Sequence, residues 1–373
     1  MRIAVPKEIK QGEKRVALVP DVINKLTRLG LEVVVESGAG LESQASDLQF
    51  TEQGAIVKKA DVLSDADVVL SVQPLTPAQI STLKKGAITI SFLSPVTAAD
   101  SIEAATKAGV TAFSLELVPR ISRAQSMDAL TSQALCAGYR AAIVGAELSP
   151  RFAPMLMTAA GTVTPAQVLV LGAGVAGLQA IATSRRLGAV VSAYDVRPAS
   201  ADEVRSMGAT FIELELEAIE GAGGYAREMS EDRATKQREL LTPFIAKSHI
   251  VITTAAVPGR QAPRLMTKEM VDSMAPGTII VDLAAETGGN VEGSKPGEII
   301  ETSGGVRIWG GKDVPSQLPF HASFLYSRNV VNLLTLFTVA EKDGVKASFN
   351  LDFDDEIIDG SVVTHAGTRR GAQ

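Results

Sequence analysis

The sequence predicts an α/β protein with two doubly wound, Rossmann-like domains, each built on a parallel sheet, and an interdomain cleft between them. Short apolar runs rich in β-branched residues alternate with helical patterns, and a second series of such runs begins at residue 167. This alternation is typical of βαβ units, in which a parallel sheet carries helices on both faces. Two series therefore predict two such domains.

The first series holds four expected strands, at residues 2–5, 31–37, 66–72 and 87–92. Helices are expected between them at residues 21–30 and 99–109. Each of these two segments shows helical spacing of its apolar residues and ends on a glycine suited to a helix C-cap.

The second series holds expected strands at residues 167–172, 189–195, 249–254 and 278–284. A long helical pattern at 128–148 is expected to bridge the domains, and another at 319–340 to return the chain to the first one. The tail is expected to form a small hairpin and a frayed end. We therefore assign residues 1–130 and 320–373 to an N-terminal α/β domain and residues 131–319 to a Rossmann domain.

The composition is that of a globular protein with no nucleic-acid partner. Of 373 residues, 46% are hydrophobic and 21% charged, and the formal net charge is −6. The single cysteine, Cys136, allows no disulfide within the chain, so the cytoplasm is the expected location. With only three histidines besides, we expect no metal site.

Neither a signal peptide nor a membrane span is expected. The N-terminus carries charges where a signal peptide has an apolar run. The longest apolar stretch near the end, residues 330–340, has 11 residues, whereas a membrane span needs about 20.

The strongest local motif is G-x-G-x-x-G, formed by Gly172, Gly174 and Gly177. It follows an apolar strand, opens a helical segment and precedes a second strand that ends at Asp195. In such a motif the first glycine permits a tight turn, the second lets a pyrophosphate approach the backbone, and the third lets helix and strand pack closely. The context predicts a dinucleotide site; the alternative is a glycine-rich turn in an ordinary α/β domain.

Asp195 stands where the motif expects a carboxylate for the adenosine ribose hydroxyls, which favours NAD over NADP. Arg197, two residues on, favours NADP mildly, because a guanidinium can bind a 2′-phosphate. We give the carboxylate more weight.

The segment "RISRAQSMD" crowds Arg120, Arg123, Gln125 and Asp128 into nine residues just before the bridging helix. A dinucleotide on the second domain would lay its nicotinamide in the cleft that this segment is expected to line. Arginine and glutamine can supply the donor and acceptor that a carboxamide needs, with Asp128 pinning Arg120 by a bidentate pair. From these residues alone, a hinge salt bridge without a ligand is an equal alternative.

Nearly the whole chain resembles the NAD(H)-binding domain I, or α subunit, of proton-translocating NAD(P) transhydrogenase. The resemblance rests on "PKE", "RVAL", "RISRAQSMD", "AGYRA", "TAAGTV", "GAGVAGLQAIATSRRLGA", "GAGGYA", "DLAAETGGN" and "DVPS". It implies that Arg120, Gln125 and Asp128 contact the nicotinamide end of NAD(H), with Ser122 and Arg123 in the same loop. Thr131 stands where the family often has serine, and keeps the hydroxyl.

The resemblance also implies contacts to the rest of the nucleotide. "AGGYA", residues 222–226, is similar to the family's mobile loop, in which Tyr225 closes over bound nucleotide beside Gly224; Gly221 and Gly223 are further candidate hinges. A plain surface loop is the alternative. Four more positions match nucleotide contacts of the family and could equally be packing or surface residues: Val175, Val196, Gln237 and Ala256.

Alanine dehydrogenase shares the fold, the "PKE" start and the glycine motif, so it is the competing interpretation. It resembles other dehydrogenases in needing a lysine and a histidine as acid–base groups. Here Ser71 and Gln73 stand where lysines would be, and Ser94 where histidine would be. Arg15 matches that relative's substrate-carboxylate arginine, and we assign it no function.

Transhydrogenation needs no acid or base at the hydride step, only two nicotinamide rings held about 3–3.5 Å apart away from water. The resemblance implies NAD(H) on this chain and NADP(H) on a partner domain, with hydride transfer coupled to proton movement through separate membrane-spanning subunits. It further implies a homodimer in the cytoplasm, peripheral on the cytoplasmic face of the bacterial inner membrane. A non-catalytic NAD-binding module is the third hypothesis.

Overall fold

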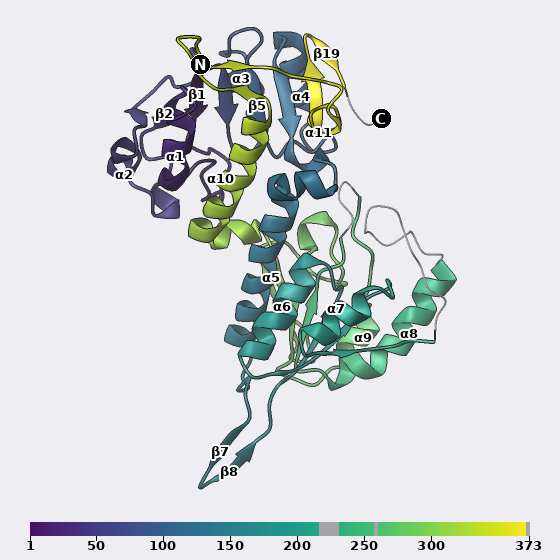
Figure 1. Ribbon diagram of the computed structural model, residues 1–373. Helices are drawn as coiled ribbons and strands as arrows, with labels where there is room; N and C mark the ends of the chain where they lie inside the picture. The colour runs from purple at the N-terminus through teal and green to yellow at the C-terminus, as the bar shows by residue number, and fades with distance from the viewer. Residues whose placement is uncertain (216–230, 257–259, 371–373) are drawn as a thin grey trace. The chain divides into compact units, whose positions relative to one another are not determined.

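The computed structural model describes residues 1–215, 231–256 and 260–370, and the chain folds into two compact units. Unit 1 comprises Met1–Gln133 and Pro315–Gln373, and unit 2 comprises Ala134–Val314. Both ends of the chain therefore belong to unit 1 (Figure 1).

We expected the first border after residue 130, and it lies three residues later, after residue 133. We expected the second border after residue 319, and it lies five residues earlier, after residue 314. The first border falls inside the long helix α5 (Ala129–Leu148), which begins in unit 1. The second shifts because Ser316 is bonded to unit 1. Its Oγ accepts from the backbone N–H of Lys14 at 2.9 Å and donates to the carboxylate of Glu13 at 2.5 Å.

Unit 1 contains an eight-stranded sheet in the order β19-β18-β6-β5-β4-β1-β2-β3. Strands β1 to β6 are parallel, and the predicted tail hairpin, β18–β19, extends the sheet antiparallel beside β6. A separate short pair, β16–β17, follows the last long helix. The strands are β1 (Arg2–Val5), β2 (Glu32–Glu36), β3 (Ile56–Lys58), β4 (Val68–Leu70), β5 (Ile88–Ser91), β6 (Thr111–Ser114), β16 (Thr338–Val339), β17 (Ser348–Phe349), β18 (Val362–His365) and β19 (Thr368–Arg369).

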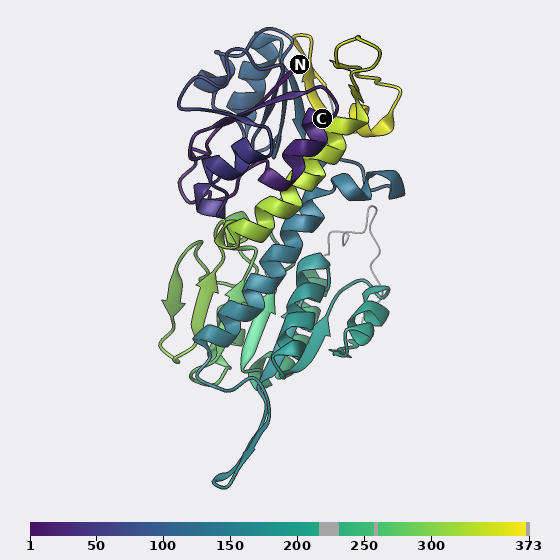
Figure 2. The same cartoon turned by 60° about the vertical axis from the view of Figure 1, so that its left-hand side comes forward.

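Helices cover both faces of this sheet (Figure 2). The helices are α1 (Pro20–Thr27), α2 (Asp47–Glu52), α3 (Pro77–Ile80), α4 (Ala99–Ala108), α10 (Pro319–Leu336) and α11 (Glu356–Ser361), with 3₁₀ turns at η1 (Leu41–Ser43), η2 (Leu115–Leu117), η3 (Ser122–Met127) and η6 (Val314–Gln317). One apolar core joins α1, α2, α10 and α11 to one face of the sheet, and a second core joins α3 and α4 to the other.

The end of α4 is as predicted, with Gly109 as a left-handed C-cap. The ends of α1 and α10 differ from the prediction. α1 ends earlier than predicted, with Arg28 as its right-handed C-cap. Gly30, at φ +81°, serves the turn that follows. α10 stops at Leu336 rather than near residue 340, because Thr338 enters the β16–β17 pair.

Unit 2 contains a seven-stranded sheet in the order β11-β10-β9-β12-β13-β15-β14, parallel except for β14 at one edge. The four predicted strands are present, whereas β11, β14 and β15 were not predicted. The strands of the sheet are β9 (Gln167–Leu171), β10 (Val190–Tyr194), β11 (Thr210–Phe211), β12 (Ile250–Thr253), β13 (Ile279–Asp282), β14 (Ile299–Glu301) and β15 (Arg307–Gly310).

Helices again lie on both faces. The helices that lie entirely in unit 2 are α6 (Val175–Arg186), α7 (Ser200–Ser206), α8 (Glu231–Lys247) and α9 (Lys268–Asp272), with a 3₁₀ turn at η5 (Ala285–Thr287). Residues of α5, α6 and α7 share one apolar core with the sheet, and those of α8 and α9 share another. In each unit, the six main strands taken in chain order lie 3-2-1-4-5-6, so the order reverses between the first and fourth strands.

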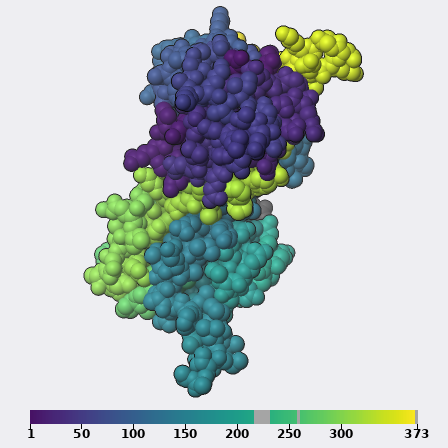
Figure 3. Space-filling model, turned by 90° about the vertical axis from the view of Figure 1, so that its left-hand side faces the viewer, coloured from purple at the N-terminus to yellow at the C-terminus, as the bar shows by residue number. Residues whose placement is uncertain are grey.

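A two-stranded hairpin, β7 (Leu156–Thr158) and β8 (Gly161–Val163), stands out from unit 2 (Figure 3). Every residue of both strands is exposed, and Met157 is 77% exposed. The sequence did not predict this hairpin, because its apolar residues do not alternate as in a half-buried strand.

Candidate functional site

The glycine-rich turn lies at the strand-order reversal of unit 2, where β9 ends between β10 and β12. Gly172 has φ +103°, which other residues rarely adopt, and a Cβ on Gly177 would stand 1.9 Å from the carbonyl oxygen of Gly172. By contrast, no atom lies within 4 Å of where a Cβ on Gly174 would stand. The first and third glycines are therefore required by the fold, whereas the second keeps open space at the N-terminus of α6.

Asp195 directly follows β10, beside this turn. Its Oδ2 accepts from the backbone N–H of Ala173 at 2.7 Å, and its Oδ1 from the backbone N–H of Arg197 at 2.9 Å. The Arg197 guanidinium completes the set, with Nε donating to Oδ1 at 2.9 Å and Nη2 to Oδ2 at 3.0 Å. This hydrogen bond and the charge of Asp195 raise the pKa of Arg197.

The end of β12 forms the other side of the turn. Thr254 Oγ1 donates to the carbonyl of Gly172 at 3.1 Å, and the fully buried Asn290 holds Ala255 by both backbone groups. Asp282, at the end of β13, accepts from the backbone N–H of Asn290. These positioning residues were not predicted as site residues, although Asp282 and Asn290 belong to the quoted "DLAAETGGN".

The other predicted unit 2 residues lie around the same strand ends. Val175 is the first residue of α6 and is 38% exposed, while Val196 is half-buried against the α8–α9 core. Gln237, on α8, is buried and accepts a hydrogen bond from the Tyr194 hydroxyl at 3.2 Å, so it already has a structural partner. Ala256 is exposed.

Gly224 and Tyr225, with the candidate hinges Gly221 and Gly223, lie outside the described residues. Their predicted closing over nucleotide stays a prediction.

In unit 1, the "RISRAQSMD" segment forms η3 and the residues on either side of it. Ala124 and Met127 are buried, whereas Arg120, Ser122 and Gln125 are exposed. Two side chains of α10, at Asn329 and Asn332, donate to the carbonyl of Ser126 at 2.9 and 3.1 Å and hold the segment in place. The motif thus presents its polar side chains on a surface that the fold fixes.

Asp128 and Arg123 each have a structural partner. Asp128 caps α5, because its two carboxylate oxygens accept from the backbone N–H and the hydroxyl of Thr131, at 2.8 and 2.7 Å. The Arg123 guanidinium makes a bidentate pair with Asp355, the N-cap residue of α11, at 2.6 and 2.9 Å. This pair lowers the pKa of Asp355. The pairing of Asp128 with Arg120 that the sequence suggested stays a prediction.

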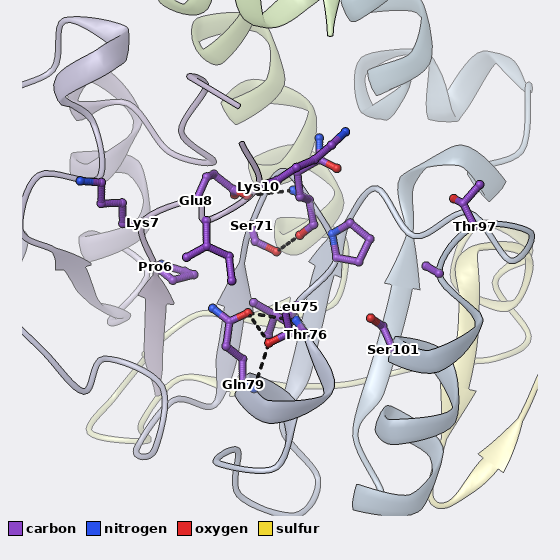
Figure 4. Close-up of a pocket in the computed structure, with 14 residues that line it drawn as sticks. Pro6, Lys7, Glu8, Lys10, Ser71, Leu75, Thr76, Gln79, Thr97 and Ser101 are labelled. Atoms are coloured by element: carbon purple, nitrogen blue, oxygen red, sulfur yellow. Dashed lines mark hydrogen bonds between the residues drawn. The ribbon is translucent and has the colours of Figure 1, made fainter. Parts of the chain in front are cut away.

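The strand-order reversal of unit 1 lies between β1 and β4, and a pocket of about 340 Å³ lies beside it (Figure 4). Glu8 projects from the loop after β1, and its carboxylate accepts from the backbone N–H groups of Val72 and Gln73, at 2.5 and 3.2 Å. Ser71 Oγ donates to the carbonyl of Gln73 at 2.7 Å. Polar side chains of this chain therefore line the pocket at the strand ends and are bonded to its backbone.

Behind the pocket lies a buried ion pair. The guanidinium of Arg15 donates through Nε and Nη2 to Glu13, at 2.7 and 2.6 Å, and through Nη1 to Gln133 at 2.9 Å. Gln73 Nε2 also donates to Glu13, at 2.7 Å. Burial by itself would raise the pKa of Glu13, but the hydrogen bonds and charge of Arg15 outweigh it and lower the pKa to about 2. Arg15 thus already donates three of its five N–H groups to partners within unit 1.

Burial raises the pKa of Glu8 to about 7, against the backbone hydrogen bonds that lower it. Glu8 lines the same pocket as Ser71 and Gln73, so a titrating group lies beside the positions where the sequence offers neither lysine nor histidine. The signal was the "PKE" motif, which was used only for the resemblance.

Two further findings bear on the predicted function. Within the described residues, no helix combines the length and apolar character needed to cross a bilayer. The same part of the chain holds no cluster of three or more histidine, cysteine, aspartate or glutamate side chains suited to a metal ion.

Comparison with known families covers both units. The N-terminal domain of the alanine dehydrogenase/PNT family matches residues 4–137, and its C-terminal domain matches residues 141–370. The chain belongs to the alanine dehydrogenase/PNT family. The two doubly wound Rossmann-like domains predicted from the sequence are confirmed by this match and by the sheets described above.

Within the family, the chain groups with the transhydrogenases. It is 48% identical to a NAD(P) transhydrogenase subunit alpha protein of Rhodospirillum rubrum over 98% of this chain and 97% of that protein. The crystal structure of transhydrogenase from Sinorhizobium meliloti is 43% identical, with a TM-score of 0.86, and covers 100% of this chain and 99% of its own. Alanine dehydrogenase of Mycobacterium tuberculosis is 34% identical over 79% of this chain and 76% of its own length. The predicted resemblance to transhydrogenase α subunits is confirmed.

Proposed function

We propose that this chain binds NAD(H) on unit 2 and exchanges hydride with NADP(H) held by a partner domain, as a transhydrogenase α subunit. The open space at Gly174, beside Asp195 and the N-terminus of α6, is the observation that carries the proposal. A pyrophosphate there would meet free backbone N–H groups and the positive end of the helix dipole. Asp195 would bind the adenosine ribose, which favours NAD over NADP on this chain.

At the nicotinamide end, we assign Arg120, Gln125 and Asp128 to positioning the reacting ring, with Ser122, Arg123 and Thr131 around them. The exposed polar side chains of η3, fixed by Asn329 and Asn332, support this assignment. Asp128 then acts through the capped start of α5 rather than only as a partner for Arg120. Hydride transfer between two nicotinamides needs alignment and exclusion of water but no acid or base.

The chemistry of the unit 1 crevice supports transhydrogenation over the alanine dehydrogenase alternative. Arg15, which would bind a substrate carboxylate, already donates three of its five N–H groups to Glu13 and Gln133. Ser71, Gln73 and Ser94 supply neither a lysine nor a histidine for imine chemistry. Glu8 titrates near neutrality, but its carboxylate is bonded to two backbone N–H groups.

Stopped-flow absorbance with and without the NADP(H)-binding domain tests the proposal. The purified chain should bind NADH, show no oxidation of it with pyruvate and ammonia, and transfer hydride rapidly once the NADP(H)-loaded domain is added. Steady pyruvate-dependent turnover by the chain alone would restore the dehydrogenase alternative. NADH binding without transfer to any NADP(H)-bearing partner would favour the non-catalytic binding module.

The assembly expected for such a subunit is a homodimer that meets NADP(H)-binding and membrane-spanning subunits at the cytoplasmic face of the bacterial inner membrane. Proton movement would pass through those membrane subunits. The exposed β7–β8 hairpin supports the homodimer, because an isolated two-stranded hairpin with apolar side chains in water is marginally stable. Light scattering of Met157→Glu should then show a shift from dimer toward monomer, and an unchanged mass would remove this support.

A further inference from the structure

The carboxylate of Asp195 is saturated by donors from its own chain. A carboxylate offers about four lone-pair sites, and four N–H groups point at this one at distances of 2.7 to 3.0 Å. The Asp195 side chain is 6% exposed and that of Arg197 is 24% exposed. No acceptor position is left for a ribose hydroxyl while this arrangement persists.

The four donors differ in how readily they can leave. Two are backbone N–H groups, of Ala173 and Arg197, fixed by the glycine turn and by the residues after β10. The other two, Nε and Nη2, belong to the Arg197 side chain, which is 24% exposed and has rotatable bonds. A ribose diol can therefore reach Asp195 only by displacing the guanidinium.

We propose that Arg197 is a specificity-determining residue that competes with the adenosine ribose for Asp195. This deepens the proposed function and rests on it. With NADH, the ribose hydroxyls replace the two guanidinium donors, so part of the binding free energy is spent on breaking the ion pair. With NADPH, the displaced guanidinium offers a cation for the 2′-phosphate, which only accepts hydrogen bonds. Arg197 therefore weakens the preference for NAD(H) that Asp195 creates.

Removing the side chain should separate the two nucleotides. Arg197→Met leaves Asp195 with two vacant acceptor sites, so NADH should bind about fivefold more tightly, the size expected for loss of one partly exposed ion pair. NADPH should bind about tenfold more weakly, since its 2′-phosphate then meets an uncompensated carboxylate and loses its cation.

Arg205→Met is the matched control. Arg205 lies on α7 of the same unit and pairs with Asp202 and Glu213, away from Asp195. It reports the general effect of removing one positive charge on the binding of an anionic dinucleotide, which should be less than about twofold for both nucleotides. An Asp195→Asn background gives a second control, because Arg197→Met should no longer tighten NADH binding there.

The experiment is calorimetric titration of NADH and NADPH into the wild-type chain, Arg197→Met, Arg205→Met, Asp195→Asn and the double variant. Tighter NADH with weaker NADPH in Arg197→Met alone supports the competition. An equal loss for both nucleotides would overturn it and make Arg197 a simple ligand contact, and unchanged affinities would make it a structural ion pair. Wild-type protein that binds no NADH would instead contradict the proposed function.

Discussion

The two strand-order reversals of this molecule share one topology and differ in what occupies them. In both units a loop follows the first strand. One backbone N–H of that loop donates a hydrogen bond to the carboxylate of an acidic residue at the end of the second strand. Asp195 accepts from Ala173 in unit 2, and Glu36 accepts from Lys7 in unit 1, at 2.7 and 2.8 Å. The framework that places a nucleotide site is therefore present twice.

The difference lies in the loops after the first strands. In unit 2 only residues 172–174 separate β9 from α6, so the helix N-terminus stands at the strand end with open space beside it. In unit 1 residues 6–19 separate β1 from α1, and this longer loop carries Glu8 to the pocket and the buried pair of Glu13 and Arg15. A short glycine loop leaves the helix N-terminus open to a ligand, whereas the long charged loop bonds the strand-end N–H groups of Val72 and Gln73 with its own Glu8 carboxylate.

The largest effect should come from closing the unit 2 turn. Gly177→Ala places a Cβ 1.9 Å from the carbonyl oxygen of Gly172, so backbone must move. We expect a loss of about 3 kcal/mol or more in the free energy of unfolding, with loss of NADH binding. Urea unfolding followed by circular dichroism measures it; wild-type stability would show that α6 does not pack closely on β9.

Gly174→Ala should separate binding from folding. Its φ of −74° suits alanine and its Cβ meets no protein atom within 4 Å, but Gly174 is the N-cap of α6, where alanine is less favourable than glycine, so the free energy of unfolding should fall by no more than ~1 kcal/mol. The added methyl enters the space proposed for the pyrophosphate, so NADH should bind at least about tenfold more weakly. Titration of NADH against this variant checks it, and wild-type affinity would remove the pyrophosphate from this turn.

How much of this comparison the sequence could predict depends on how local each feature is. The glycine turn and Asp195 lie within 24 residues of one another, and their place between a strand, a helical segment and a second strand predicted a dinucleotide site. The unit 1 cluster joins Glu13 to Gln73 and to Ser316, which are 60 and 303 residues away, so no local pattern could reveal it.

The missed secondary structure has a similar explanation. α8 is strongly polar, with Pro243 inside it, and only Leu241, Ile245 and Gln237 are buried along its length. Short edge strands such as β11 and β14 leave too few apolar residues to form a recognisable pattern. Conversely, the central strands β4, β5, β12 and β13 were predicted, because each is buried at every residue and lies in an apolar run. The interior strands β6 and β15 were missed, since polar residues or glycine interrupt their short apolar runs.

The two acidic residues at the second-strand ends offer a matched pair of variants. Asp195→Ala should weaken NADH binding about tenfold, since it removes the proposed ribose acceptor. It should also reduce the difference between the affinities for NADH and NADPH. Glu36→Ala removes only the acceptor of the Lys7 N–H, so it should cost ~1 kcal/mol of stability and leave NADH affinity unchanged. Titrating both nucleotides into both variants compares the sites directly; equal effects on NADH would mean that the two reversals are functionally alike.

The last prediction concerns the strand-order reversal of unit 1 and appears as a pH dependence of the free energy of unfolding. Glu8 has its pKa raised from 4.5 in the unfolded chain to about 7 by burial, so the folded state keeps a proton that the unfolded state releases in this range. Stability from this group is therefore lost as pH rises from 4.5 to 7, by up to ~3 kcal/mol. Glu13 affects stability in a different pH range. Its pKa is lowered to about 2, so its contribution to the free energy of unfolding is lost only as pH falls from 4.5 toward 2.

Glu8→Gln removes the titration while keeping one oxygen to accept from the backbone of Val72 or Gln73. The free energy of unfolding of Glu8→Gln, relative to that of wild type, should therefore be higher at pH 8 than at pH 5. Glu42 is exposed, so Glu42→Gln should show the same difference from wild type at both pH values. Urea unfolding of the three proteins at the two pH values decides this. If the curves of wild type and Glu8→Gln run parallel, Glu8 stays charged in the fold. The backbone N–H groups of Val72 and Gln73 would then be bonded by an ionised carboxylate rather than a protonated one.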